Sequence, residues 1–182
     1  MAAILSGVVA AAIAHRLDPE LVEAVCLVES GGNPFAWNPE PAWRYFWNVR
    51  TGRPFRAVTA AELAAERPPT DFHALAGAGD ADQEWWGQQA SWGLMQVMGA
   101  VAREFGFADP YLPKLTVPEV GLEYGCRVLA ERLRWAGGDV RAAVAAYNGG
   151  KGGNAAGGPL RNAAYADKVE QQLAALRRHV NA

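Results

Sequence analysis

The stretch "AVCLVESGGNP", residues 24–34, decides both the fold and the chemistry of this chain. It ends a helix that starts at "LDPEL", where Asp18 can cap the first turn and Pro19 fits the first helical position. Along this helix, apolar side chains recur every three or four positions and define one face: Leu21, Val25 and Val28. Two glycines and "NP" then break the pattern, so we expect a helix over residues 19–30 followed by a sharp turn.

Glu29 is the residue of this helix that carries chemistry. Its neighbours three and four positions earlier are Cys26 and Val25, so Glu29 shares the apolar face. A carboxylate there loses hydration, and this loss raises its pKa. A carboxyl group that keeps its proton near neutral pH can donate that proton to a leaving oxygen. The alternative is a glutamate at a helix end that points into solvent, and the helix by itself leaves both interpretations open.

Composition indicates one globular domain with a substantial core, since 182 residues are 51% hydrophobic and 20% charged. A net charge of −2 argues against a nucleic-acid-binding protein, which needs a basic surface. The apolar N-terminal run is too short to span a bilayer, so we expect no stable membrane insertion. It also lacks the basic start of a secretory signal peptide, and we expect none.

The cysteines and histidines form no recognisable ligand pattern. Cys26 and Cys126 lie far apart, each on the apolar side of a predicted helix, and we expect buried free thiols with a single disulfide as the alternative. The three histidines are scattered along the chain. The sequence therefore predicts no metal site and no cofactor.

Most of the remaining chain has helical patterning. Helices are expected over residues 3–16, 94–105, 116–135, 139–148 and 161–180. Thr116 and Glu119 have capping-box spacing, and Asp139 is placed as an N-cap.

Residues 35–90 differ from the rest of the chain. They contain one short helix candidate, 59–67, and are loop-like over 68–84. Six of the seven tryptophans lie between positions 37 and 92, and this concentration argues against disorder.

Two further motifs carry polar residues beside glycines. In "SWGLMQ", Ser91 and Gln96 could hold a polar ligand while Gly93 permits close approach of the backbone, although a capping serine before a core Leu-Met pair explains it equally well. In "AAYNGG", Tyr147 lies on an apolar stripe and its hydroxyl needs a buried partner. Asn148 is either a cap or a functional residue.

Three segments in this order resemble a known family: "ES" at 29–30, "GLMQ" at 93–96 and "AYNGG" at 146–150. They resemble the soluble lytic transglycosylase (SLT) domain of the goose-type lysozyme-like superfamily, over about residues 5–36 and 90–170. "SWGLMQVMGAVAREFGF", with "PAWRYFW" upstream, looks most like versions from phages and prophages. The resemblance implies an all-α (mainly α), lysozyme-like single domain over residues 1–182, with a long aromatic-rich insertion at approximately 35–90.

The resemblance also implies roles for individual residues. Glu29 would be the catalytic acid and then the base, and the substrate-binding residues would be Ser30, Ser91, Trp92, Gly93, Met95, Gln96, Tyr147 and Asn148. Trp92 is the strongest candidate for stacking on a sugar, ahead of Trp37 and Trp43; the alternative for the tryptophans is an apolar cluster that folds the insertion.

The implied substrate is the glycan strand of bacterial peptidoglycan. It would be cut at the β-1,4 bond between N-acetylmuramic acid and N-acetylglucosamine, leaving a 1,6-anhydromuramoyl end. The enzyme would act on the cell wall, delivered as a phage endolysin or virion-associated protein together with other virion or lysis components.

Two departures from the family pattern leave alternatives open. The interval between the first two motifs is long and contains five acidic residues: Glu40, Asp71, Asp80, Asp82 and Glu84. One of them could position a water molecule and make the enzyme a hydrolytic muramidase. The alternative is that all five are solvated. Gly99 stands where the family often has proline, which we expect to affect only a helix start. A non-catalytic glycan-binding or phage-tail component is a third hypothesis, and retention of Glu29, Gln96 and Tyr147 together speaks against it.

Overall fold

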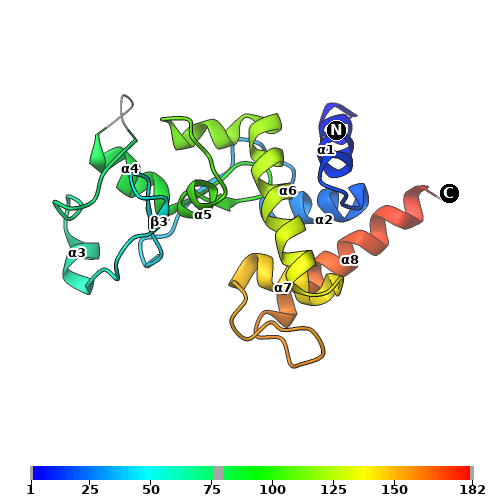
Figure 1. Ribbon diagram of the computed structural model, residues 1–182. Helices are drawn as coiled ribbons and strands as arrows, with labels where there is room; N and C mark the ends of the chain where they lie inside the picture. The colour runs from blue at the N-terminus through cyan, green and yellow to red at the C-terminus, as the bar shows by residue number, and fades with distance from the viewer. Residues whose placement is uncertain (1, 76–79, 181–182) are drawn as a thin grey trace. The chain divides into compact units, whose positions relative to one another are not determined.

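The computed structural model describes the backbone of residues 2–75 and 80–180 and the side chains of residues 7–75 and 80–178 (Figure 1). Helices dominate the described residues and the strands are short, which confirms the mainly α prediction. The chain forms two compact units. The first unit comprises Met1–Gly32 and Gly125–Ala182, and the second comprises Asn33–Tyr124. Among the helices of the described ranges, none combines the length and apolarity required to cross a bilayer.

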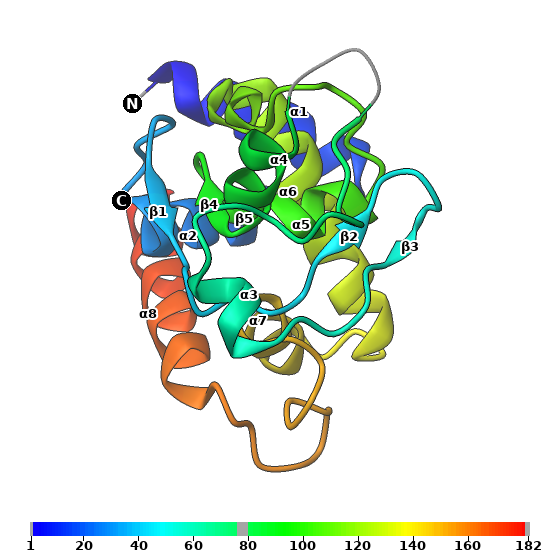
Figure 2. The same cartoon turned by 90° about the vertical axis from the view of Figure 1, so that its left-hand side faces the viewer.

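The first unit contains the two chain ends. Its helices are α1 (Ala2–Ala14), α2 (Pro19–Ser30), α7 (Val140–Gly149) and α8 (Ala163–Val180), together with the last part of α6 (Pro118–Trp135). Helix α2 packs against both α1 and α8, and α7 packs against α8 (Figures 1 and 2). Helix α2 is therefore the central element of this unit.

Both ends of α2 form as the sequence predicts. The Asp18 carboxylate accepts a hydrogen bond from the backbone N–H of Glu20 at 2.9 Å. At the other end Gly31 takes a left-handed conformation with φ +61°, and its N–H bonds to the carbonyl of Leu27 at 3.0 Å. The helix consequently ends at Ser30, one residue after Glu29, and Gly31 begins a turn that only glycine adopts without strain.

Helix α7 is buried along five consecutive small or branched residues, 142–146. Asp139 caps it as predicted, accepting from the N–H of Ala142 at 3.0 Å. Small side chains let α7 approach α8 closely, and Arg141 forms ion pairs with Asp167 and Glu170 of α8. This packing fixes the end of α7, where Tyr147 and Asn148 lie.

The second unit is built on a three-stranded antiparallel sheet in the order β1-β4-β5, with strands Trp37–Pro39, Ala90–Trp92 and Val97–Met98 (Figure 2). Trp37 lies opposite Trp92, and Ser91 lies opposite Met98. Strands β2 (Trp47–Asn48) and β3 (Arg53–Pro54) form a small hairpin. The helices of this unit are α3 (Ala60–Ala64), α4 (Ala81–Gln88) and α5 (Gly99–Glu104), together with the short 3-10 helix η1 (Leu112–Thr116).

The predicted helix over 94–105 is wrong in its first part. Residues 94–96 form the turn that joins β4 to β5, and α5 starts only at Gly99. The turn requires positive φ angles at Gly93 (+73°) and Gln96 (+46°), which a helix does not allow. None of the five short strands follows from the sequence pattern, because two or three residues are too few to show alternation.

Three other boundaries also differ from expectation. The loop predicted over 68–84 contains the start of α4, where Asp80 accepts from the N–H of Gln83 at 2.8 Å; residues 76–79 of that loop lie outside the described residues. Thr116 makes no capping box, because its hydroxyl bonds to the carbonyl of Pro113 at 2.7 Å and α6 starts at Pro118. The helix predicted over 59–67 ends at Ala64, although its capping box is present.

The aromatic residues of the insertion form a core of their own. Phe46, Val58, Phe72 and Trp85 are buried together, and the rings of Phe46 and Trp85 stack with centroids 4.0 Å apart. Trp85 is completely buried, so the apolar-cluster interpretation holds for this tryptophan.

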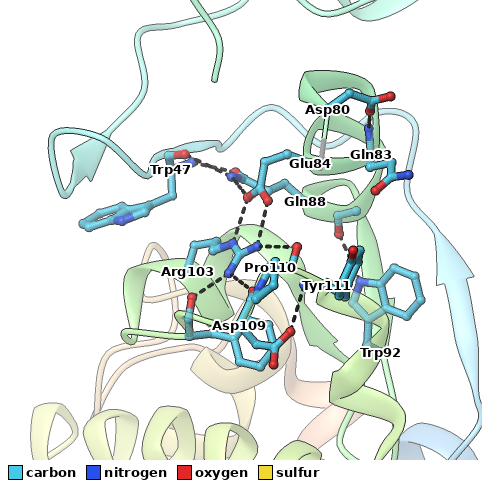
Figure 3. A network of polar contacts seen from close by, with 12 residues as sticks. Trp47, Asp80, Gln83, Glu84, Gln88, Trp92, Arg103, Asp109, Pro110 and Tyr111 are labelled. Carbon is cyan, nitrogen blue, oxygen red and sulfur yellow. Dashed lines mark hydrogen bonds and ion pairs between the residues drawn. The ribbon is translucent and has the colours of Figure 1, made fainter. Parts of the chain in front are cut away.

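A buried ion pair ties α4 to α5 within the same unit. The Arg103 guanidinium donates to both carboxylate oxygens of Glu84, at 2.8 and 2.7 Å (Figure 3). Gln88 donates to Glu84 at 2.7 Å and also bonds to the backbone of Trp47. Gly99 lets the two helices meet, because a Cβ there would lie 2.1 Å from the carbonyl oxygen of Gly87.

Candidate active site

Glu29 lies half-buried in the last turn of α2, facing α8. The hydroxyl of Tyr165, from the first turn of α8, donates a hydrogen bond to Oε1 of Glu29 at 2.6 Å. The packing of α2 on α8 brings together two residues that are 136 positions apart in the sequence. The carboxyl group therefore has a fixed orientation within the first unit.

Burial controls the protonation of this carboxyl group. Loss of hydration raises the pKa of Glu29 from 4.5 to about 7, and the hydrogen bond from Tyr165 opposes the rise because it favours the charged form. A carboxylate at the C-terminal end of a helix is also disfavoured by the helix dipole. These surroundings agree with the expectation of a shielded Glu29 rather than a solvated one. Near neutral pH the group can both give and take a proton.

Two tyrosine hydroxyls surround Glu29 and remain protonated. Burial and then the charge of Glu29 raise the pKa of Tyr165, and the same two causes, in the same order, raise the pKa of Tyr147 well above 10. Both hydroxyls can thus act as hydrogen-bond donors at any pH where the protein works. Tyr147 lies in the last turn of α7 and is half-buried.

Asn148 is exposed next to Tyr147 and is held by a neighbouring side chain. Its Oδ1 accepts from Nδ2 of Asn162 at 2.7 Å. Gly149, the last residue of α7, leaves room for this contact, since a Cβ there would lie 2.4 Å from the Asn162 side chain. The helix cap is Gly150, so Asn148 does not serve as the cap.

Ser30 and Cys26 complete the surroundings of Glu29 within the helix. The Ser30 hydroxyl donates to the carbonyl of Cys26 at 2.9 Å, a contact within the last turns of α2. Cys26 and Cys126 are both buried and neither forms a disulfide, which confirms the prediction of buried thiols over the disulfide alternative. Burial raises the pKa of Cys26, so this thiol is an inert part of the apolar wall.

The other predicted residues belong to the second unit, where they form the β4–β5 turn. The Gln96 side chain accepts from the Ser91 hydroxyl at 2.9 Å and donates to the carbonyls of Gly93 at 2.9 Å and Ala36 at 3.2 Å. These contacts satisfy the amide within the turn itself. They favour a structural role, in which Gln96 ties β1 and the turn together.

Gly93, Met95 and Trp92 are also explained mainly by packing. A Cβ at Gly93 would lie 2.3 Å from the carbonyl oxygen of Leu115, so the close approach expected for a ligand is made by the chain itself. Met95 has no exposed surface. Trp92 is 9% exposed, and its indole N–H donates to the carbonyl of Gly87 at 3.0 Å.

Sequence reasoning missed Tyr165, whose hydroxyl donates the hydrogen bond to Glu29. Its position on the apolar stripe of the last helix indicated only a core residue. The signal was nevertheless present, because a tyrosine hydroxyl on a buried face needs a polar partner and Glu29 is the acid on a buried face of another helix. Within the residues that the structure describes, no three His, Cys, Asp or Glu side chains are grouped so that they could hold a metal ion.

Comparison with known proteins gives one match. The family model of the transglycosylase SLT domain matches residues 8–168, a range that contains both Glu29 and Tyr165. No curated protein and no solved structure matches the chain.

Proposed function

Because the chain belongs to the transglycosylase SLT domain family, whose members are lytic transglycosylases that act on peptidoglycan, we propose that Glu29 is the single catalytic carboxylate of this enzyme. The observation that carries the proposal is the shielded Glu29 carboxyl, with a pKa of about 7 and a hydrogen bond from Tyr165. The lysozyme-like fold of the family accords with the mainly α structure.

The reaction proposed is a transfer within the glycan strand. Glu29 donates its proton to the oxygen of the β-1,4 bond between N-acetylmuramic acid and N-acetylglucosamine, and the bond from the anomeric carbon to that oxygen breaks. The resulting carboxylate takes the proton of the muramoyl 6-hydroxyl as this oxygen bonds to the anomeric carbon. The products are a 1,6-anhydromuramoyl end and a free 4-hydroxyl, and Glu29 is protonated again.

The proposal needs no second carboxylate because the attacking hydroxyl belongs to the substrate. Holding the nucleophile within the same sugar replaces part of the work that a second acidic residue does in ordinary glycosidases. Tyr165 keeps the carboxyl group oriented in both protonation states, and the Tyr147 hydroxyl offers a second donor beside it. We assign substrate orientation to Tyr147 and Asn148.

The contacts of the insertion acids favour transfer over hydrolysis. Glu84 is 3% exposed and fully engaged with Arg103, so it cannot position a water. Asp71 is paired with Arg56, which lowers the pKa of this carboxyl. Asp80 caps α4, and Glu40 accepts a hydrogen bond from Asn38. Four of the five insertion acids thus have a structural partner, and the fifth, Asp82, lies in the first turn of α4.

A turbidity assay on purified peptidoglycan tests the role of Glu29. The Glu29→Gln variant keeps the volume and the capacity to accept from Tyr165 but cannot donate a carboxyl proton, so clearing should fall by about 10²-fold or more. Glu104→Gln, which changes an exposed carboxylate of α5, should clear as fast as the wild type. Equal clearing by Glu29→Gln and the wild type would contradict the proposal and would favour a structural or merely glycan-binding protein.

Action on the cell wall follows from the family. Delivery by a phage, as an endolysin or within a virion, is a further proposal that rests on the likeness of "SWGLMQVMGAVAREFGF" to phage versions.

A further inference from the structure

The second unit contains a pocket that the proposed reaction does not use. Its volume is about 360 Å³, which lies within the range typical of small-molecule sites. Leu112 and two prolines line it, together with four aromatic side chains: Trp37, Trp86, Trp92 and Tyr111. All of these residues belong to Asn33–Tyr124, so the pocket is complete within this unit.

The rings are held by the sheet and helices before any ligand arrives. Trp37 and Trp92 lie opposite each other on β1 and β4, with ring centroids 6.0 Å apart and planes inclined by 36°. The indole of Trp92 is fixed by its hydrogen bond to Gly87 of α4. Tyr111 is fixed at its backbone, where its N–H donates to Asp109 at 2.9 Å (Figure 3). A preformed site loses little entropy when it binds.

Unlike ordinary core residues, several of these aromatic side chains are open to solvent. Trp37 is 57% exposed, Trp86 is 45% exposed and Tyr111 is 52% exposed. Exposed aromatic residues gathered around one hollow commonly mark a binding site. Trp85, the neighbour of Trp86 in α4, is by contrast completely buried, so α4 directs one tryptophan to the core and the next to the pocket.

The charge of the pocket identifies the kind of ligand that fits. Glu84 is the one charged residue that lines it, and this carboxylate is neutralised by Arg103 through two hydrogen bonds (Figure 3). Desolvating a charged ligand there would gain no opposite charge in return. The pocket therefore suits an uncharged ligand with flat apolar faces.

A sugar ring has these properties. The axial C–H groups of a pyranose carry partial positive charge and stack on the negative face of an aromatic ring. Its hydroxyl and acetamido groups lie at the rim, where the exposed Gln83 amide and the Tyr111 hydroxyl can exchange hydrogen bonds with them. An aliphatic ligand would make no hydrogen bonds with these two polar groups.

We propose that this pocket is a saccharide subsite that binds one N-acetylhexosamine ring of a glycan through Trp37, Trp86, Trp92 and Tyr111. The identity of the glycan rests on the proposed function, since peptidoglycan supplies N-acetylhexosamines. The pocket depends on α4 of the insertion, which gives this long segment a role in holding the strand rather than in the bond-breaking step.

Binding can be measured without turnover in the Glu29→Gln background. The probe is the β-1,4-linked tetramer of N-acetylglucosamine, titrated by calorimetry against that variant and against the double variants that add Trp86→Ala or Trp37→Ala. Each removes an exposed ring, and we expect the dissociation constant to rise by about tenfold or more. Trp135→Ala, which removes a partly exposed tryptophan of the first unit, is the matched control and should leave the affinity unchanged.

Two outcomes would overturn the subsite. One is an affinity for the tetramer that neither Trp86→Ala nor Trp37→Ala alters, and the other is no binding of the tetramer at all; either would point instead to a protein partner for the aromatic surface. In the otherwise wild-type enzyme, Trp86→Ala should raise KM and leave kcat unchanged. Failure of the proposed function is a separate result, because it appears as clearing by Glu29→Gln whatever the tetramer does.

Discussion

Replacing Glu29 by glutamine should stabilise the folded protein, and the gain should depend on pH. Burial raises the pKa of Glu29 from 4.5 to about 7, so the folded state resists the loss of this proton. A carboxyl group whose pKa is higher in the folded state contributes its full stabilisation at a pH below its pKa in the unfolded state. This stabilisation is lost as the pH rises through its pKa in the folded state. A tenfold change in an ionisation constant is worth about 1.4 kcal/mol, so full ionisation of Glu29 costs about 3 kcal/mol.

The Glu29→Gln variant escapes this cost because it stays neutral. We expect its advantage in the free energy of unfolding to be below about 1 kcal/mol near pH 5 and to grow to about 3 kcal/mol near pH 8.5. Urea unfolding of both proteins across this range, followed by tryptophan fluorescence, measures the difference. The exposed Glu104→Gln should show no such growth. A difference for Glu29→Gln that stays constant with pH would refute the reasoning, because the carboxyl would then titrate alike in both states.

Three further predictions concern the neighbours of Glu29 and the insertion. Tyr165→Phe removes the hydrogen bond that favours the charged carboxylate, so the alkaline limb of the pH–activity profile should move up by about one pH unit, and an unmoved limb would contradict the assignment. Glu84→Gln leaves the buried Arg103 without its counter-charge and should lower the free energy of unfolding in urea by about 3 kcal/mol. Asp71→Asn, which breaks a solvent-exposed pair, should leave the free energy of unfolding nearly unchanged, and equal losses for the two variants would argue against the buried network. Gly99→Ala places a methyl group 2.1 Å from the Gly87 carbonyl oxygen and should lower the free energy of unfolding by about 3 kcal/mol. Gly152→Ala, whose methyl group meets nothing within 4 Å, should change it by about 0.5 kcal/mol at most. An unchanged stability of Gly99→Ala would show that α4 and α5 are not in close contact.

The helices of the first unit could be predicted from local capping and terminating residues in the sequence. Asp18 and Asp139 cap α2 and α7 as predicted, and Gly31 ends α2. Such signals act over one turn, so a single sequence is enough to find them. The spacing of Glu29 to Cys26 and Val25 placed it on the apolar face but left a solvated carboxylate as the alternative, and the structure shows the side chain half-buried.

The second unit could not be predicted in the same way. Its strands have two or three residues, and they form because Gln96, Gly93 and Ala36 share hydrogen bonds across more than fifty positions. Long-range contacts of this kind leave no periodic pattern in the sequence. The Glu84–Arg103 pair is similar, since an isolated Glu and Arg nineteen positions apart give no indication of burial.

The partner of Glu29 shows the same limit within the site. The resemblance placed Tyr147 among the substrate-binding residues and assigned no role to Tyr165, whose hydroxyl donates the direct hydrogen bond to Glu29. Both tyrosines lie on apolar helix faces, and only the packing of α2 on α8 selects between them. Family motifs drew attention to Tyr147, whereas Tyr165 lies outside the three segments on which the resemblance rests.

The central claim is that Glu29 acts as the single catalytic carboxylate of a transfer reaction. The most direct test of this claim is the chemical nature of the ends left on the glycan. Purified peptidoglycan should be digested with the wild-type protein and the released muropeptides weighed by mass spectrometry. Our account predicts 1,6-anhydromuramoyl ends, each lighter than a reducing end by the mass of one water molecule. Reducing ends as the main product would contradict it, because they would show that water, and not the muramoyl 6-hydroxyl, attacks the anomeric carbon.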